Sequence, residues 1–121
     1  MDSQFFNTNG HNARPKDEIR IEKLGATPYA DRYRVHVQIE VTPFEERPNL
    51  ILVAHDEDDN PVGELDIIAT MHASMEFTMH LRDVDDPAGL YTLTADLFYE
   101  TRSPPQDQRI VTFTIPEADE S

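Results

Sequence analysis

The chain has 121 residues, a length typical of one domain with a single core, and 24 acidic against 10 basic residues give it a formal net charge of −14. A charge of this sign repels phosphate backbones and anionic lipid, so neither nucleic acid nor a membrane is expected as a partner. Cysteine is absent, which excludes disulfides, thiolate metal sites and cysteine nucleophiles.

The two ends of the chain hold little that a core could bury. Residues 1–17 contain Phe5 and Phe6, and residues 116–121 read PEADES. We expect a flexible N-terminal tail over 1–17, a domain over 18–115 and an acidic C-terminal tail over 116–121. No stretch has the length and apolar character of a signal peptide or a membrane span. The chain as given is therefore expected to be cytoplasmic, although a domain excised from an exported protein would look the same.

Alternation of apolar and polar residues, interrupted by Pro, Gly, Asn and Asp, predicts strands rather than helices. The first strand is short, residues 18–24, and a turn over residues 25–31 follows it. The second strand, residues 32–42, has one polar face and one apolar face, the latter formed by Tyr33, Val35, Val37, Ile39 and Val41. The third, residues 49–55, is apolar on both faces, as expected of a central strand.

The second half of the chain repeats this pattern. A polar turn over residues 56–61 precedes a strand at 62–70, and a fifth strand covers 75–82. The sixth strand, residues 89–100, places one apolar set in phase: Tyr91, Leu93, Ala95, Leu97 and Tyr99. A seventh strand covers residues 110–115. Seven short strands with evenly spaced turns predict an antiparallel β-sandwich with the apolar faces inside.

The run from Asp86 through Tyr91 to Leu93 resembles the tyrosine corner of immunoglobulin-like domains. In that corner, a tyrosine at the start of a strand bonds the backbone of the preceding connection. Leu93 falls where antibody domains have their second cysteine, and the chain has no tryptophan. The resemblance is therefore to the disulfide-free, fibronectin type III-like branch. It implies an immunoglobulin-like, seven-stranded sandwich and says little about function.

That strand order gathers alternate loops at opposite ends of the sandwich. One end collects residues 25–31, 56–61 and 83–88, and it is predicted to be strongly acidic. Aspartate is common in turns because its side chain bonds nearby backbone. Calcium, however, binds several carboxylate and carbonyl oxygens and is the alternative explanation. Its candidate ligands are Asp56, Asp58, Asp59, Asp83, Asp85 and Asp86, and no other cofactor is expected.

The patterns of catalytic residues are weak. His36 and His80 lie on outward phases of strands that pair in this fold, but no local spacing typical of zinc accompanies them. The serines fall in tails or loops, and paired carboxylates are common in so acidic a chain. We therefore expect that the protein is not an enzyme.

Two surfaces are candidates for contact with a protein. On one outer sheet face, Phe98 and Ile110 join an outward pair of the third strand, either Ile51 with Val53 or Leu50 with Leu52. A contiguous apolar patch of this kind marks a partner, unless the tail with Phe5 and Phe6 covers it. The second surface comprises the loops 43–48 and 101–108, whose contact residues would be Phe44, Arg47, Tyr99 and Arg102.

The expected function is contact with another protein or with a second copy of the chain. One alternative is a calcium-binding or calcium-stabilised module. Another is a carbohydrate-binding module, although such modules usually expose a row of Trp or Tyr and this chain has no Trp and four Tyr.

Overall fold

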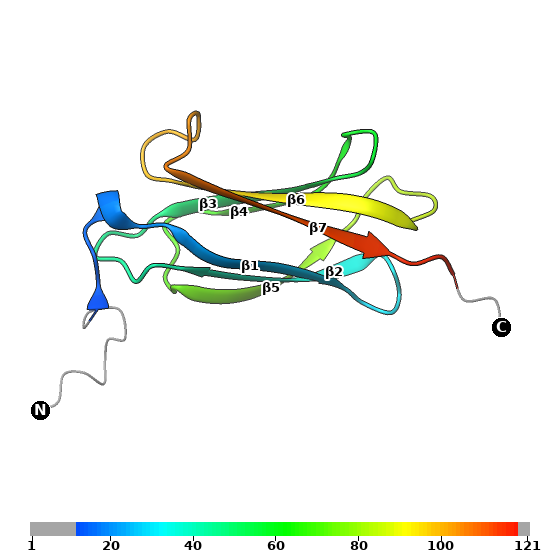
Figure 1. Cartoon of the computed structure of the whole chain (residues 1–121), viewed down its shortest axis with the longest axis horizontal. Coiled ribbons are helices and arrows are strands. Elements are labelled where there is room, and N and C mark those ends of the chain that lie inside the picture. Colours follow the sequence, from blue (N-terminus) through cyan, green and yellow to red (C-terminus); the bar gives the residue numbers. More distant parts are fainter. Residues whose placement is uncertain (1–11, 119–121) are drawn as a thin grey trace, which may run out of the picture.

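The computed structural model describes residues 12–118 and has seven strands in two antiparallel sheets (Figure 1). One sheet has the order β1-β2-β5 and the other the order β4-β3-β6-β7. The strands are β1 (Ile21–Pro28), β2 (Arg34–Val41), β3 (Asn49–His55), β4 (Pro61–Ile67), β5 (Ser74–His80), β6 (Gly89–Phe98) and β7 (Asp107–Ile115). This arrangement confirms the predicted seven-stranded antiparallel β-sandwich. Within residues 12–118, no helix is both long and apolar enough to cross a membrane.

The core lies between the inward faces of the two sheets. On β2, the even alternation buries Val35, Val37, Ile39 and Val41, and on β6 it buries Tyr91, Leu93, Ala95 and Leu97. Each large apolar side chain that is fully buried contributes about 1.5–3 kcal/mol to folding. The predicted inward faces of these two strands are therefore confirmed, except for Tyr33 and for Tyr99, which follows β6 and is only half-buried.

Strand ends differ from the sequence-based expectation. The first strand starts at Ile21 and continues to Pro28, with Gly25 paired to Gln38 of β2. The residues assigned to a turn thus extend a strand, because pairing with the long β2 outweighs the weak strand preference of Gly and Pro. β4 ends at Ile67 rather than at residue 70.

The segment before β1 lies against the sandwich. The backbone N–H of Arg14 donates to Pro43 O at 2.9 Å, and the carbonyl of Arg14 accepts the N–H of Glu45 at 3.0 Å. The short 3-10 helix η2 (Lys16–Glu18) follows, and Ile19 is fully buried. These contacts fall at the boundary that the sequence set between tail and domain.

The two long sides of the sandwich differ. On one side, β7 closes over β1: the Asp107 carboxylate accepts the N–H of Ile21 at 2.8 Å, and Arg109 donates to the carbonyl of Ile21 at 2.8 Å. On the other side, β4 and β5 touch only near one end, where Arg82 N donates to Val62 O at 2.8 Å. Away from that contact, inward-facing residues of these two edges remain only half-buried, namely Leu65, Ile67 and Phe77. The core is therefore open along the β4–β5 side.

Candidate functional site

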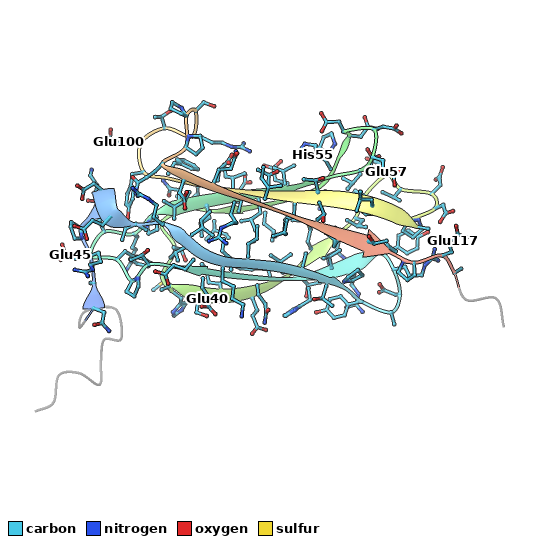
Figure 2. All side chains as sticks on the ribbon, viewed as in Figure 1. Glu40, Glu45, His55, Glu57, Glu100 and Glu117 are labelled. Atoms are coloured by element: carbon cyan, nitrogen blue, oxygen red, sulfur yellow. The ribbon has the colours of Figure 1, made fainter. Side chains whose placement is uncertain are left out.

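The acidic loops meet at one end of the sandwich, as predicted. The connections from β3 to β4 and from β5 to β6 lie next to each other there (Figure 1). Together they line a cavity of about 250 Å³. The lining includes five of the candidate calcium ligands, Asp56, Asp58, Asp83, Asp85 and Asp86, together with Glu57. Asp59 is not part of that lining. Figure 2 places Glu57 and Glu117 toward this end, but Glu45 and Glu100 lie at the other, so carboxylates occupy both ends.

The carboxylate of Asp56 is used within its own turn. It accepts hydrogen bonds from the backbone of Asp58 at 3.0 Å and of Asn60 at 2.9 Å, and the Asn60 amide adds a longer one at 3.4 Å. The Asn60 backbone bond is the main reason why the pKa of Asp56 lies below its ordinary value. These bonds shape the β3–β4 turn as aspartate commonly does.

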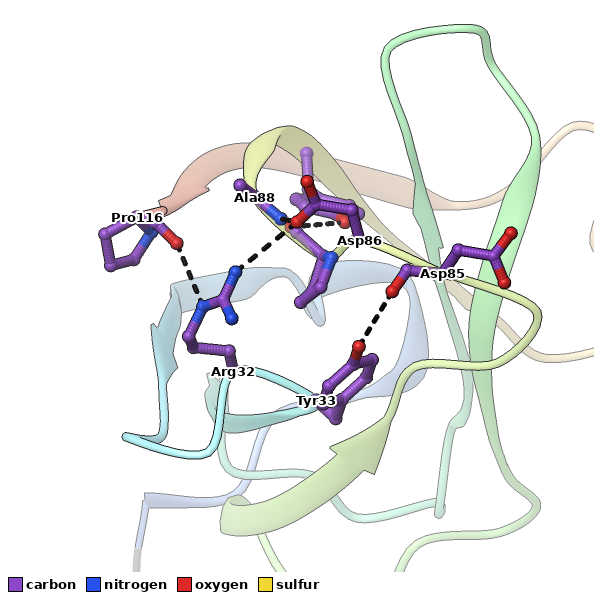
Figure 3. Close-up of polar contacts among 8 residues, drawn as sticks. Arg32, Tyr33, Asp85, Asp86, Ala88 and Pro116 are labelled. Carbon is purple, nitrogen blue, oxygen red and sulfur yellow. Dashed lines mark hydrogen bonds and ion pairs between the residues drawn. The ribbon is translucent and has the colours of Figure 1, made fainter. Parts of the chain in front are cut away.

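Two further carboxylates at this end also bond the protein itself. Glu57 accepts the backbone N–H of Leu90 at 3.0 Å and so joins the β3–β4 turn to the start of β6. Asp86 accepts the backbone N–H of Ala88 at 3.1 Å and the guanidinium of Arg32 at 3.4 Å (Figure 3). Arg32 in turn donates to the carbonyl of Pro116 at 3.1 Å. The acidic residues therefore hold the loops together.

Over residues 12–118, no three His, Asp or Glu side chains gather closely enough to hold a metal ion. The calcium alternative stays a prediction. Zinc binding by the outward histidines also stays a prediction. His36 pairs with Thr78 and contacts Glu76 at 3.0 Å, whereas His80 pairs with Arg34.

The tyrosine corner and the predicted core tyrosine are distinct in their surroundings. Tyr91 is buried, donates its hydroxyl hydrogen to Pro87 O at 2.7 Å, and stacks on Phe113 with ring centroids 5.2 Å apart. The bond implied by the resemblance is therefore present. The prediction that Tyr33 lies in the core is wrong, because its side chain is 41% exposed. It precedes the first residue of β2 and extends along the rim to donate to Asp85 O at 2.9 Å (Figure 3).

The predicted apolar outer face of the four-stranded sheet is only partly apolar. The outward pair of β3 is Ile51 with Val53, since Leu50 and Leu52 are fully buried inside. Val53 is itself only 8% exposed, so it adds little to an outer patch. Ile110 is 54% exposed and Phe98 is half-buried, as the alternation requires. Polar residues cross the same face.

Asp96 lies directly between Ile51 and Gln108 in the pairing of β3, β6 and β7. It accepts hydrogen bonds from Arg102 at 3.0 Å and from Gln108 at 2.8 Å. On β4, the hydrogen bond and the negative charge of Asp66 raise the pKa of Glu64. This face is therefore a mixed surface and not a continuous apolar patch.

The second predicted contact surface loses its central aromatic residue. Phe44 is only 5% exposed, because the chain at Arg14 pairs with it and it packs into the core. Arg47 and Arg102 remain exposed. Tyr99 is half-buried and donates to Glu46 O at 2.8 Å, and burial and the Glu46 carboxylate raise its pKa to about 12. Phe44 is therefore excluded as a surface contact in this conformation.

An apolar groove not expected from the sequence lies on the open β4–β5 side. It has a volume of about 510 Å³ and is lined by the end of β4, the β4–β5 connection and the first half of β5. Its most exposed apolar residues are Ile68 at 68% and Met71 at 62%, and Met75 and Phe77 form its floor and wall. The buried hydroxyl of Thr70 donates to His72 O at 3.1 Å and fixes the connection.

Sequence reasoning missed this groove because it assigned residues 62–70 to a strand, whereas β4 ends at Ile67. One signal was present. Ile67 and Ile68 are adjacent and so break the alternation, and Met71 follows them in a segment too short for another strand. Adjacent apolar residues at the end of a half-buried strand cannot both point inward.

The sequence matches no protein-family model, and no curated protein is similar enough to count as a relative. Solved structures do share the fold. A β-glucuronidase from Bifidobacterium dentium, complexed with coumarin-3-O-glucuronide, superposes with a TM-score of 0.61 at 18% identity, covering 80% of this chain and 18% of that one. A glycosyl hydrolase family 2 member from Bacteroides cellulosilyticus gives 0.56 at 15% identity, covering 80% and 15%.

An FMN-binding β-glucuronidase from Faecalibacterium prausnitzii gives a TM-score of 0.53 at 15% identity, covering 75% of this chain and 14% of that one. The chain therefore spans less than a fifth of the length of these solved proteins. At such low identity, the similarity establishes the β-sandwich fold alone.

Proposed function

We propose that this chain is a non-catalytic β-sandwich module that binds another protein through the groove on its β4–β5 side. The observation that carries the proposal is the groove itself, with Ile68 and Met71 more than half exposed above the half-buried Phe77. When a partner removes apolar side chains in a concave surface from water, the free energy of binding becomes more favourable. The outer face around Phe98 and Ile110 is the weaker candidate, because Asp96 and its partners interrupt it.

The comparisons do not transfer an activity to this chain. The similar solved proteins are glycosyl hydrolases, but each matches over a small fraction of its own length. A small sandwich of this kind occurs with many roles. Carbohydrate binding stays an alternative that rests on this fold similarity and on no site in the described residues.

Matched aspartate substitutions test the proposal. Ile68→Asp places a charge in the groove, and Ile110→Asp places one on another exposed isoleucine, on β7 at the opposite edge of the same sheet. Each variant is used beside the unchanged chain in affinity capture from the source cells, with bound proteins identified by mass spectrometry. We expect a protein that is retained by the unchanged chain and by Ile110→Asp and lost with Ile68→Asp. Equal retention by both variants would exclude the groove as the binding surface.

Both variants must keep the fold for this comparison to hold. Both side chains are largely in solvent, so each change should alter the free energy of unfolding by less than about 0.5 kcal/mol. Thermal unfolding followed by circular dichroism measures this directly. Sedimentation velocity of the unchanged chain then determines whether the captured partner is a second copy.

A further inference from the structure

The outer edge of β5 has backbone groups directed away from its only neighbour in the sheet. Leu81 N donates to Tyr33 O at 2.9 Å, and Val41 N donates to Ala73 O at 2.8 Å, so odd-numbered residues of this segment bond β2. In an antiparallel pair, the residues between them direct their N–H and C=O groups to the opposite side. On β5 these residues are Ser74, Glu76, Thr78 and His80. His80 lies where β4 approaches at Gly63, so the free stretch of the edge comprises Ser74, Glu76 and Thr78. Within residues 12–118, no hydrogen bond reaches their backbone from that side.

The contrast with the other edge of the same sheet is informative. Side chains of β7, and of the residue before it, bond the backbone at and just before the start of β1. Asp107 and Arg109 bond Ile21, and Gln106 donates to Ile19 O at 2.9 Å. Proteins commonly protect a sheet edge in such ways. In the described part of the chain, β4 covers the β5 edge only at the His80 end, and no side chain bonds the outward backbone groups of Ser74, Glu76 and Thr78.

The apolar groove runs along this unprotected edge. Consecutive residues of β5, from Ser74 to Phe77, form one wall of it, whereas β4 contributes only its last residue, Ile67. A strand added to β5 would lie about 4.8 Å from it. Because side chains alternate along a strand, every second side chain of the added strand would point into the groove.

Charge indicates what kind of segment fits. Glu76 lines the groove, and Glu40 of β2 is paired with Ser74, which is another lining residue. His36 contacts Glu76, and His72 is the other titratable group of the lining. The whole chain carries a net charge of −14, so a second copy would be repelled and a basic segment attracted.

We propose that β5 accepts an extended, basic segment of a partner protein as an added strand, with alternate apolar side chains of that segment seated in the groove. The inference rests on the proposed function and specifies the binding mode. Main-chain hydrogen bonds to Ser74, Glu76 and Thr78 would supply affinity, and the groove would select the apolar side chains.

A short synthetic peptide tests the binding mode without knowledge of the natural partner. The probe alternates lysine with valine over about seven residues, the length of β5. In titrations of the full, isotope-labelled chain followed by nuclear magnetic resonance, we expect saturable shifts of the amides of Ser74, Glu76 and Thr78. Binding should be at least about tenfold weaker for a glutamate–valine peptide and for a lysine–glycine peptide. No binding of the lysine–valine peptide at millimolar concentration would overturn the proposal.

Methylated peptides separate strand addition from simple apolar contact. One analogue carries N-methyl groups on the valines and the other on the lysines, so each blocks one edge of the peptide. For strand addition, one analogue should bind like the parent and the other at least about tenfold more weakly. Equal binding of both would overturn the proposed hydrogen bonding, and the protein is unchanged in this comparison.

A backbone variant gives the complementary result. Glu76→Pro removes an N–H that faces the free edge, and Glu76→Gln removes the charge but keeps that N–H. We expect Glu76→Pro to abolish peptide binding, and Glu76→Gln to weaken it by no more than about tenfold. Equal affinity of the two variants would contradict strand addition.

The outcomes distinguish this inference from the proposed function. A partner that is lost with Ile68→Asp, together with no peptide binding, would leave the groove as a binding surface and exclude strand addition. Tighter peptide binding by a Phe5→Ser, Phe6→Ser double variant would assign the groove to residues 1–11 of the chain itself. Concentration-dependent dimers that the peptide dissociates would assign it to a second copy. Either result would overturn the assignment to a partner.

Discussion

Tyr91 and Tyr33 each donate a hydrogen bond to the backbone of the β5–β6 connection, but from different environments. Tyr91 is buried and bonds Pro87 O, whereas Tyr33 is 41% exposed and bonds Asp85 O. Burial is also the main cause that raises the pKa of Tyr91 above its ordinary value. The cost of losing each bond therefore depends on access to water.

Tyr91→Phe should lower the free energy of unfolding by about 1–3 kcal/mol, because it leaves a buried carbonyl without a partner. Tyr33→Phe should cost less than about 1 kcal/mol, since water can bond Asp85 O instead. Urea unfolding followed by circular dichroism compares the two. Equal costs would mean that the corner bond contributes no more than a surface bond.

Asp56 makes the β3–β4 turn sensitive to acid. Its folded-state pKa is lowered from the ordinary value of 3.8, mainly by the backbone of Asn60. A group with a depressed folded pKa contributes stability above its unfolded pKa, and this contribution is lost as the pH falls through the folded pKa. Asp56→Asn keeps an acceptor oxygen but does not titrate. We expect thermal unfolding midpoints of this variant to fall less steeply below about pH 4 than those of the unchanged chain.

Asp58→Asn is the matched control, because it removes the same charge from the same turn and leaves the bonds of Asp56 intact. Its midpoints should follow the unchanged chain through the acid range. A flattened profile for Asp58→Asn as well would show that net charge, and not the turn, determines the acid response.

At the scale of elements, β4 approaches β5 closely at Gly63. A Cβ atom built there would lie 2.8 Å from Met79 Sδ and 3.3 Å from the backbone oxygen of His80. Met79 is buried, so it has little room to move. We expect Gly63→Ala to lower the free energy of unfolding by about 1–3 kcal/mol, as overpacking in a core does. Thermal unfolding of the purified variant measures the change.

Gly25→Ala on β1 is the control, because the nearest atom to its added Cβ would be Gln38 Oε1 at 3.8 Å. Alanine there should be neutral or stabilise by up to about 1 kcal/mol, since it restricts the unfolded chain. A similar loss of stability for both variants would indicate intrinsic strand preference and not the close approach of β4 to β5.

The same elements show what a sequence pattern can and cannot predict. Alternation gave the correct inward face for β2 and β6, because one buried face imposes a period of two along the whole strand. Strand ends were less predictable. The first strand was expected to end at residue 24, but β1 continues through Gly25 to Pro28 because β2 pairs with these residues. Tyr33 follows the inward phase of β2 but lies just before the strand starts, so the phase no longer determines its burial.

At the scale of the whole molecule, the candidate site was the least predictable feature. The groove depends on which strands lie at the sheet edges and on how far those edges separate. Neither is encoded in a periodic pattern. Phe44 shows the reverse case, since a loop phenylalanine that was expected on the surface is buried by contacts with residues remote in sequence. The acidic end could be predicted, because strand order alone brings alternate loops together.

Because the chain has a net charge of −14, we expect its free energy of unfolding to increase with salt concentration. Carboxylates at both ends repel one another, and added salt screens this repulsion by shortening the Debye length from about 10 Å at 0.1 M to about 3 Å at 1 M. We expect the melting temperature to rise by about 3–8 °C between low salt and 0.5 M sodium chloride, which corresponds to about 1 kcal/mol. A constant or falling melting temperature would show that the ion pairs outweigh the repulsion.

Calcium separates this general screening from a specific site at the acidic end. Asp56, Glu57 and Asp86 already accept hydrogen bonds from the protein, and over residues 12–118 no three metal-binding side chains gather closely. We therefore expect millimolar calcium and magnesium chlorides to raise the melting temperature equally at matched ionic strength. A ligand that binds only the folded state at about 100 times its dissociation constant would add about 2.7 kcal/mol. An additional rise with calcium alone, abolished by Asp58→Asn with Asp83→Asn, would instead establish the calcium site predicted from the sequence.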